Sequence, residues 1–145
     1  MIRIHGTSVA LGGDGILLQG PSGSGKSDLA LRLIDGGARL IADDQTELSL
    51  LEGELRLSAP ATIAGRIEVR GIGILSIPTV ASAPLRLVVA LVPPGEVERL
   101  PEPQFCTLLG RSVPRVTLAA FEASTPAKIR LAVDTLAASL SFVPS

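Results

Sequence analysis

The sequence has few of the residues on which several protein classes depend. It contains one cysteine in 145 residues, no tryptophan, no tyrosine and three phenylalanines. A single cysteine excludes an internal disulfide framework and favours a reducing compartment. Three aromatic side chains are too few for the stacking platforms that hold single-stranded nucleic acid. The 13 basic and 14 acidic residues give a net charge of −1, so no cationic excess exists to hold a phosphate backbone, and we expect no nucleic-acid partner.

Long apolar segments are also absent, although 46% of the residues are hydrophobic. No run approaches the ~18 apolar residues that a membrane-spanning helix needs. The first residues, MIRIHG, lack the apolar stretch of a signal peptide. We therefore expect a cytoplasmic protein with no membrane partner. Its length predicts a single domain over residues 1–145 with an adequate hydrophobic core.

The clearest pattern is a strand, a glycine-rich loop and a helix in succession. Apolar residues 16–18 predict a buried strand, and residues 28–35 carry apolar side chains at helical spacing. The loop between them, Gly20 to Ser27, matches G-x-x-x-x-G-K-[ST] at every position. In such a loop the glycines let successive N–H groups point into one concavity that holds phosphate oxygens, beside the positive end of the helix. Lys26 would meet the β- and γ-phosphates, and Ser27 would offer a hydroxyl to Mg²⁺.

The rest of the chain is rich in short apolar segments typical of strands. A Glu-Gly-Glu turn predicts one hairpin, a proline-rich stretch predicts a loop, and a second helix is predicted to begin with Thr125 as a cap and Pro126 in the first turn. One βαβ unit among these strands predicts an α/β fold with a mixed, partly antiparallel sheet flanked by helices. The predicted strands are 2–11, 39–42, 47–51, 55–59, 67–77 (bent at its glycines), 85–92 and 116–118; the loop is 93–103; the apolar face of the last helix is Ile129, Val133, Leu136 and Leu140.

Two adjacent aspartates, Asp43 and Asp44, directly follow the predicted strand 39–42. In a parallel βαβ unit the carboxyl ends of both strands lie at one edge of the sheet, so these carboxylates are expected beside the phosphate loop. One of them could hold Mg²⁺ while the other accepts a proton from a hydroxyl group. A turn or helix cap is the alternative for an Asp-Asp pair, but the neighbouring phosphate loop favours chemistry.

Other polar residues have less distinctive settings. His5 is the only histidine, and a lone histidine is usually structural or exposed. Glu68 lies on an alternating segment where a solvent-facing glutamate is ordinary. Arg99, in the proline-rich loop, could close over a γ-phosphate, although spacing alone does not indicate it. Cys106 is given no chemistry, because no histidine lies near it in the sequence.

Together these residues resemble the catalytic domain of the HPr kinase/phosphorylase family. The resemblance extends from His5 to about Arg130, and it includes His5-Gly6, the loop 20–27, the segment RLIADD (39–44) and the segment IEVRGIGI (67–74). It implies a P-loop nucleotide-binding core similar to that of HPr kinase and phosphoenolpyruvate carboxykinase. It also implies an ATP- and Mg²⁺-dependent serine kinase that acts on HPr, the phosphocarrier protein of the phosphotransferase system, and that forms a homohexamer.

The resemblance implies a role for each matching residue. Asp44 would take the proton of the target serine, and His5 would lie beside it. Arg99 would be the catalytic arginine. The Mg²⁺ ligands would be Ser27, Glu68 and Asp43, and the nucleotide-binding residues would be Gly20, Pro21, Ser22, Gly23, Ser24, Gly25, Lys26 and Ser27.

The chain departs from the family pattern in two respects. Longer members carry a further N-terminal domain, so we expect a short form that consists of the catalytic domain. Where the family has a Pro/Arg/Gly-rich segment linked to dephosphorylation, this chain reads AAFEAS from Ala119 to Ser124. Glu122 would repel inorganic phosphate, which predicts weak reverse phosphorolysis.

Two alternatives remain open at the level of sequence. A small-molecule kinase would need a lid and an enclosed acceptor pocket, and the loop 93–103 is short for a lid. A non-catalytic nucleotide-sensing module would fit the altered segment 119–124. Intact Lys26, Asp44 and Glu68 count against that module, because binding alone needs no general base.

Overall fold

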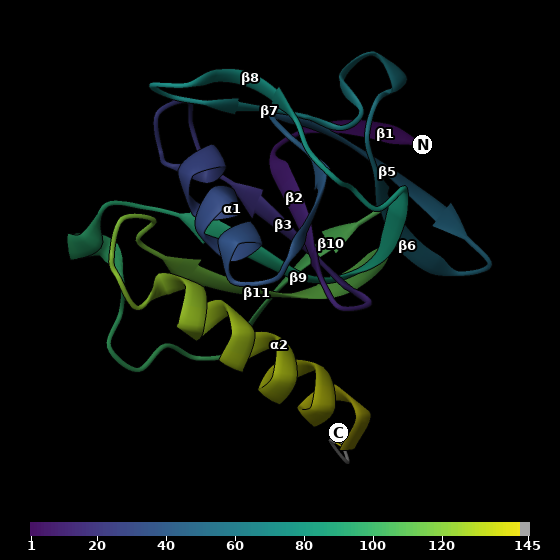
Figure 1. Ribbon diagram of the computed structural model, residues 1–145. Helices are drawn as coiled ribbons and strands as arrows, with labels where there is room; N and C mark the ends of the chain where they lie inside the picture. Colours follow the sequence, from purple (N-terminus) through teal and green to yellow (C-terminus); the bar gives the residue numbers. More distant parts are fainter. Residues whose placement is uncertain (143–145) are drawn as a thin grey trace.

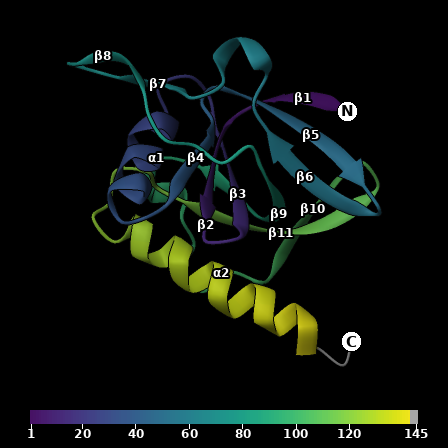
Figure 2. The same cartoon turned by 45° about the vertical axis from the view of Figure 1, so that its right-hand side comes forward.

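The computed structural model describes residues 1–142 as a strongly mixed α/β arrangement (Figures 1 and 2). The strands in this part of the chain are β1 (Ile2–His5), β2 (Thr7–Leu11), β3 (Asp14–Gln19), β4 (Arg39–Ala42), β5 (Gln45–Leu51), β6 (Glu54–Ser58), β7 (Arg66–Val69), β8 (Gly73–Ser76), β9 (Ser82–Leu91), β10 (Gln104–Leu108) and β11 (Arg111–Leu118). The α-helices there are α1 (Lys26–Asp35) and α2 (Thr125–Phe142), and short 3-10 helices cover Ala61–Ile63 and Pro94–Glu96.

Strand β9 joins the parts of the nine-stranded sheet, which has the order β1-β5-β6-β9-β3-β2-β4, with β11 beside β9 and β10 beside β11. The start of β9 pairs antiparallel with β6, whereas its later residues pair parallel with both β3 and β11. Because one long strand serves two sets of partners, the sheet curls. Residues 87–91 of β9 form an uninterrupted apolar run and are all buried, as expected for a strand covered on both faces. The mixed sheet flanked by helices is therefore as predicted.

The two α-helices pack against the sheet and against each other. Leu29 and Leu33 of α1 are fully buried in one core cluster, together with Ile129 and Val133 of α2. The side chains of Leu136 and Leu140, predicted to continue this face, lie outside the described residues. Figure 1 shows α1 between α2 and the separate β7–β8 hairpin, and both helices contact strands of the sheet.

The arrangement of β2, β3 and β4 positions the predicted site. Strand β2 lies between the other two and is antiparallel to both, so β3 and β4 run in the same direction. The phosphate-loop motif follows β3, and Asp43-Asp44 follow β4. Both segments therefore emerge at the same edge of the sheet, as predicted, although strand β2 lies between the two strands, β3 and β4, that precede them.

Some element predictions were wrong. The single strand expected over 2–11 is two strands, because the chain breaks at Gly6, where a Cβ would lie 2.9 Å from the carbonyl oxygen of Leu18. The bent strand expected over 67–77 is the hairpin β7–β8, which turns at residues 70–72. Strand β10 was missed and β11 is longer than expected; Pro114 within β11 weakens a strand pattern.

The predictions for the start of the last helix and for the proline-rich loop can also be compared with the structure. Helix α2 begins at Thr125 as expected, but the bond recorded for the Thr125 hydroxyl is one that it donates to the carbonyl of Ala119 (2.6 Å), and not one that it accepts from a helix N–H as a cap would. The predicted loop 93–103 is confirmed apart from its short 3-10 turn. Within residues 1–142, no helix is long and apolar enough to cross a membrane.

Candidate active site

A cavity of about 780 Å³ opens where the phosphate-loop motif, the end of β4 and the β7–β8 hairpin meet. Its lining combines glycine backbone, charged side chains and a few apolar ones. Seven of the lining residues were predicted from the sequence to belong to the site: Ser22, Gly23, Gly25, Lys26, Ser27, Asp44 and Glu68. The structure therefore brings together the phosphate loop, one aspartate and the glutamate, whose lining residues are up to 46 positions apart in the chain.

The phosphate-loop motif has the backbone that its glycines permit. Gly23 (φ +83°) and Gly25 (φ +97°) both adopt left-handed conformations, and Gly25 is the N-cap of α1. A Cβ on Gly25 would lie 2.7 Å from the Cβ of Ala120, so a side chain has no room there. The first N–H groups of α1 have no partner within the helix, and Lys26, Ser27 and Asp28 of this first turn line the cavity, an arrangement that favours an anion.

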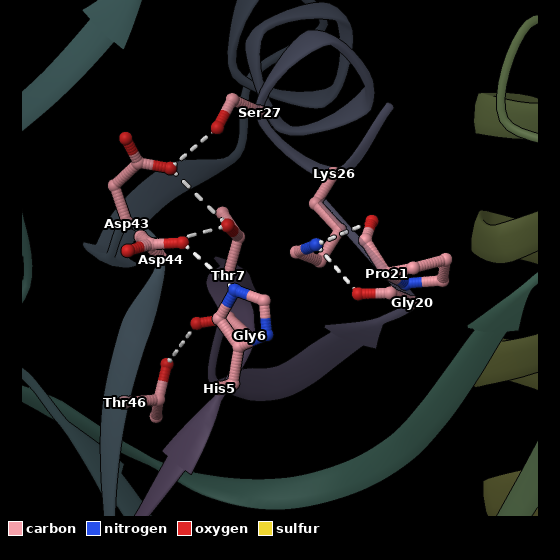
Figure 3. Close-up of polar contacts among 10 residues, drawn as sticks. All are labelled: His5, Gly6, Thr7, Gly20, Pro21, Lys26, Ser27, Asp43, Asp44 and Thr46. Carbon is pink, nitrogen blue, oxygen red and sulfur yellow. Dashed lines mark hydrogen bonds and ion pairs between the residues drawn. The ribbon is translucent and has the colours of Figure 1, made fainter. Parts of the chain in front are cut away.

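The Lys26 side chain is bent back over the loop (Figure 3) and is only 6% exposed. Its ammonium group donates to the carbonyls of Gly20 (2.6 Å) and Pro21 (3.0 Å). An ammonium group has three N–H donors, so one remains for a further acceptor. The loop thus holds a desolvated positive charge at the cavity, with one donor available to an anionic ligand.

The Asp43 side chain is buried, and its carboxylate accepts hydrogen bonds from several neighbouring groups (Figure 3). Its Oδ1 accepts from the hydroxyls of Ser27 (2.7 Å) and Thr7 (3.1 Å), and its Oδ2 accepts from the backbone N–H of Glu68 (3.1 Å). Three donors on a carboxylate offset the cost of removing its charge from water. Through these contacts Asp43 connects α1, β2 and β7 and fixes the Ser27 hydroxyl at the cavity wall.

Asp44 has the opposite setting. Its backbone is left-handed (φ +68°), at the apex of a tight turn in which the Gln45 N–H donates to the carbonyl of Asp43 (2.7 Å). Such a conformation is costly for a non-glycine residue and is characteristic of functional sites. The side chain is 67% exposed, and its Oδ1 lies 2.9 Å from Nε2 of His5. Because a carboxylate only accepts, His5 Nε2–H donates and orients the carboxylate at the cavity.

Thr7 was not predicted from the sequence. Its side chain is fully buried, donates to Asp43 and accepts from the backbone N–H of Asp44 (3.1 Å), so one hydroxyl positions both aspartates. The Gly6 N–H also donates to the carbonyl of Asp44 (2.9 Å). The available signal was a hydroxyl residue at the start of an otherwise apolar strand, directly after His5-Gly6.

Arg99 is not brought to the cavity. It lies exposed in the loop after β9 and is not among the cavity-lining residues, so its position does not support the catalytic role predicted for it. The loop 93–103 leaves the sheet from β9, whereas the arginine that lines the cavity, Arg70, is carried by the turn of the β7–β8 hairpin. Cys106 also lies away from the cavity, and burial raises the pKa of its thiol, with the Arg115 guanidinium opposing the shift.

The oxygen donors at the cavity suit a divalent cation. Among residues 1–142, no group of three or more His, Cys, Asp or Glu side chains is placed to hold a metal by itself. Mg²⁺, however, usually takes one or two carboxylates and leaves its other positions to water and phosphate oxygens. The Ser27 hydroxyl, held by Asp43, and the Glu68 side chain in the lining provide such a partial set. The donor chemistry therefore fits Mg²⁺ bound together with a phosphate ligand.

Comparison with known proteins gives a consistent result. The family of HPr Serine kinase C-terminal domains matches residues 1–138. HPr kinase/phosphorylase of Clostridium tetani is 48% identical over 77 residues (53% of this chain and 25% of that protein), and that of Thermoanaerobacter sp. strain X514 is 53% identical over 79 residues (54% and 26%). The matched segment thus spans about a quarter of the length of these relatives.

A solved structure, titled as that of the Hpr(Ser) kinase/phosphatase from Coxiella burnetii, has a similar fold. It superposes with a TM-score of 0.82 at 26% sequence identity, and the alignment covers all of both chains. The likeness therefore includes the β-strands and helices that surround the cavity.

Proposed function

The chain belongs to the family of HPr serine kinase C-terminal domains, and from this premise we propose that it transfers the γ-phosphoryl group of ATP to a serine of HPr, the phosphocarrier protein. The observation that carries the proposal is the meeting of the phosphate-loop motif and the exposed Asp44 carboxylate in one cavity. We also propose that residues 1–145 form a single kinase domain that works as a homo-oligomer in the cytoplasm.

In this proposal the phosphate loop binds the triphosphate. Backbone N–H groups of residues 22–27 face the phosphate oxygens, and the free donor of Lys26 meets the β- and γ-phosphates. Ser27 and Glu68 would hold Mg²⁺, and Asp43, whose carboxylate already accepts three hydrogen bonds, would act through Ser27 and water. When bound, Mg²⁺ would neutralise charge on the phosphates.

Asp44 is the general base of the proposed reaction. The serine hydroxyl gives its proton to the Asp44 carboxylate while the serine oxygen forms a bond to the γ-phosphorus. The bond from that phosphorus to the bridging oxygen breaks, and ADP leaves. His5 keeps the carboxylate turned to the cavity through its 2.9 Å contact. Lys26 and Arg70, both in the lining, stabilise the negative charge on the transferred group.

The first test is Asp44→Asn. Asparagine tolerates the left-handed backbone at this position, so the variant keeps its turn and loses only the base. We expect ATP affinity to be retained and transfer of radiolabelled phosphate to HPr to fall by about 100- to 10,000-fold. Asp35→Asn, at the exposed end of α1 outside the cavity lining, is the matched control and should leave transfer unchanged.

The result of this assay separates the alternatives. Near-wild-type transfer by Asp44→Asn would remove Asp44 as the base. ATP binding by the wild-type chain without transfer to HPr would favour a nucleotide-sensing module. Transfer to a small-molecule acceptor, but not to HPr, would favour a small-molecule kinase.

Reverse phosphorolysis is expected to be weak. The segment 119–124 contributes no basic side chain of its own, and its Glu122 carboxylate, 3.6 Å from the Lys128 ammonium, pairs with a cation that could otherwise bind an anion. The segment therefore offers inorganic phosphate no positive charge to hold it. Incubation of serine-phosphorylated HPr with phosphate should release pyrophosphate at least roughly tenfold more slowly than the forward transfer proceeds. Rapid pyrophosphate release would contradict this prediction.

A further inference from the structure

An exposed aromatic ring lies at the proposed nucleotide cavity. Phe121 is 69% exposed and is the aromatic residue that the described part of the chain contributes to the cavity lining. Burial of an aromatic side chain normally stabilises a fold, and the exposed ring of Phe121 does not make that contribution. The ring is thus available to a ligand in the cavity.

The backbone around Phe121 is firmly held. The Arg32 guanidinium of α1 donates to the carbonyl of Ala120 and to that of Glu122 (3.2 Å), the two residues that flank Phe121. Asp28 fixes the same guanidinium through an ion pair (2.9 Å). Phe121 is therefore carried by a segment whose backbone is anchored on both sides of it.

That position is against the phosphate loop. A Cβ on Gly25 would lie 2.8 Å from Cζ and 3.1 Å from Cε1 of Phe121, so the ring covers the loop at the N-cap of α1. A triphosphate bound in the loop leads outward to its ribose and base. Phe121 is the aromatic surface in the described lining against which the flat, apolar base can rest once it leaves the loop.

We infer that Phe121 is the platform on which the purine base of the nucleotide stacks, an inference that rests on the proposed function. Phe121 offers a π-face to the base, and stacking of this kind tolerates different bases. ATP and GTP should therefore both benefit from it. The protein acceptor, in contrast, has to reach Asp44, which is held by residues of β1 and β2, whereas Phe121 is carried by the segment that covers Gly25.

The absence of tryptophan and tyrosine from the sequence allows a direct test. In Phe121→Trp the new residue is the only tryptophan, and we expect its fluorescence to be quenched by ATP with Mg²⁺ but not by tripolyphosphate, which has no base. Phe105→Trp, at a 52% exposed position of β10 outside the cavity lining, is the matched control and should respond to neither ligand.

A second variant measures the contribution to binding. Phe121→Ala should weaken the binding of ATP about tenfold, as expected for loss of one stacked base, and leave the affinity for tripolyphosphate unchanged. Equal loss of affinity for both ligands would mean that the variant disturbs the phosphate loop, and would overturn the inference. An unchanged affinity for ATP would also overturn the inference.

The outcomes distinguish this inference from the proposed function. If the wild-type chain binds no ATP in the presence of Mg²⁺, the proposed function and the stacking role both fail. If it binds ATP and Phe121→Ala binds it equally well, only the stacking role fails. An increased KM for HPr at unchanged ATP affinity would assign Phe121 to the protein acceptor, and would also overturn the inference.

Discussion

Asp43 and Asp44 are neighbours in the chain, but the structure gives their carboxylates different environments. Asp43 is buried and accepts three hydrogen bonds from groups on three elements. Asp44 stands exposed on a left-handed backbone, with His5 as its side-chain partner. A saturated carboxylate is suited to holding other groups in place, and an accessible one to exchanging a proton. The division of roles proposed for the pair follows from this difference.

Thr7 provides the residue-scale test of this division. In Thr7→Val the volume is nearly kept, but Asp43 loses one donor and the Asp44 N–H loses its acceptor. We expect the free energy of unfolding to fall by about 1–3 kcal/mol, because buried polar groups are left unpaired. The transfer rate should also fall while ATP affinity is kept, because the loop residues are untouched. Denaturant unfolding and the transfer assay measure the two effects.

Thr7→Ser is the control for Thr7→Val, because it keeps the hydroxyl and removes only a methyl group. It should recover most of the lost transfer rate. If serine and valine at this position are equally impaired, the hydroxyl does not position the aspartates.

At the scale of elements, Arg32 joins α1 to the segment 119–124 through two backbone carbonyls. Lysine at this position could keep a positive charge but could not reach both carbonyls with a planar, forked group. For Arg32→Lys we expect faster amide hydrogen exchange in residues 119–124 and a free energy of unfolding lower by about 1–2 kcal/mol. Arg39→Lys, at an exposed position of β4, is the matched control. Unchanged exchange in Arg32→Lys would show that the segment is held by other contacts.

Elements whose signals are local were predicted well, and elements that depend on distant partners were not. The loop 20–27, the helix after it and the Asp43-Asp44 pair each have a recognisable short pattern, and their meeting follows from parallel strands at one sheet edge. The break at Gly6 depends on the close approach of Leu18, a contact between segments that leaves no local pattern. One local element was also missed: β10 pairs with β11 across the short turn at Leu109-Gly110, but Pro114 weakens the strand pattern of β11.

The same reasoning applies to the residues of the site. Thr7 matters because β2 lies between β3 and β4, which a linear pattern does not reveal. Arg99 was predicted from the resemblance to the family and not from spacing; it is not among the residues that line the cavity, whereas Arg70 lines the cavity from the hairpin turn.

At the scale of the whole molecule, the fold gathers distant segments around one cavity. Five segments line the cavity or form hydrogen bonds to residues that line it: 5–7, 20–28, 43–44, 68–74 and 121. The curled sheet achieves this because β9 pairs with strands on both sides and α1 is enclosed by α2 and the hairpin (Figure 2). The proposed reaction centre is therefore a property of the complete sheet and not of the phosphate-loop motif alone.

The most direct test of this account is a crystal structure with a non-hydrolysable ATP analogue and Mg²⁺. The account predicts the triphosphate in the loop 20–27, with the Lys26 ammonium on its oxygens and the Asp44 carboxylate facing the γ-phosphate. A cavity without nucleotide under these conditions, or an Asp44 side chain turned away from the terminal phosphate, would contradict it.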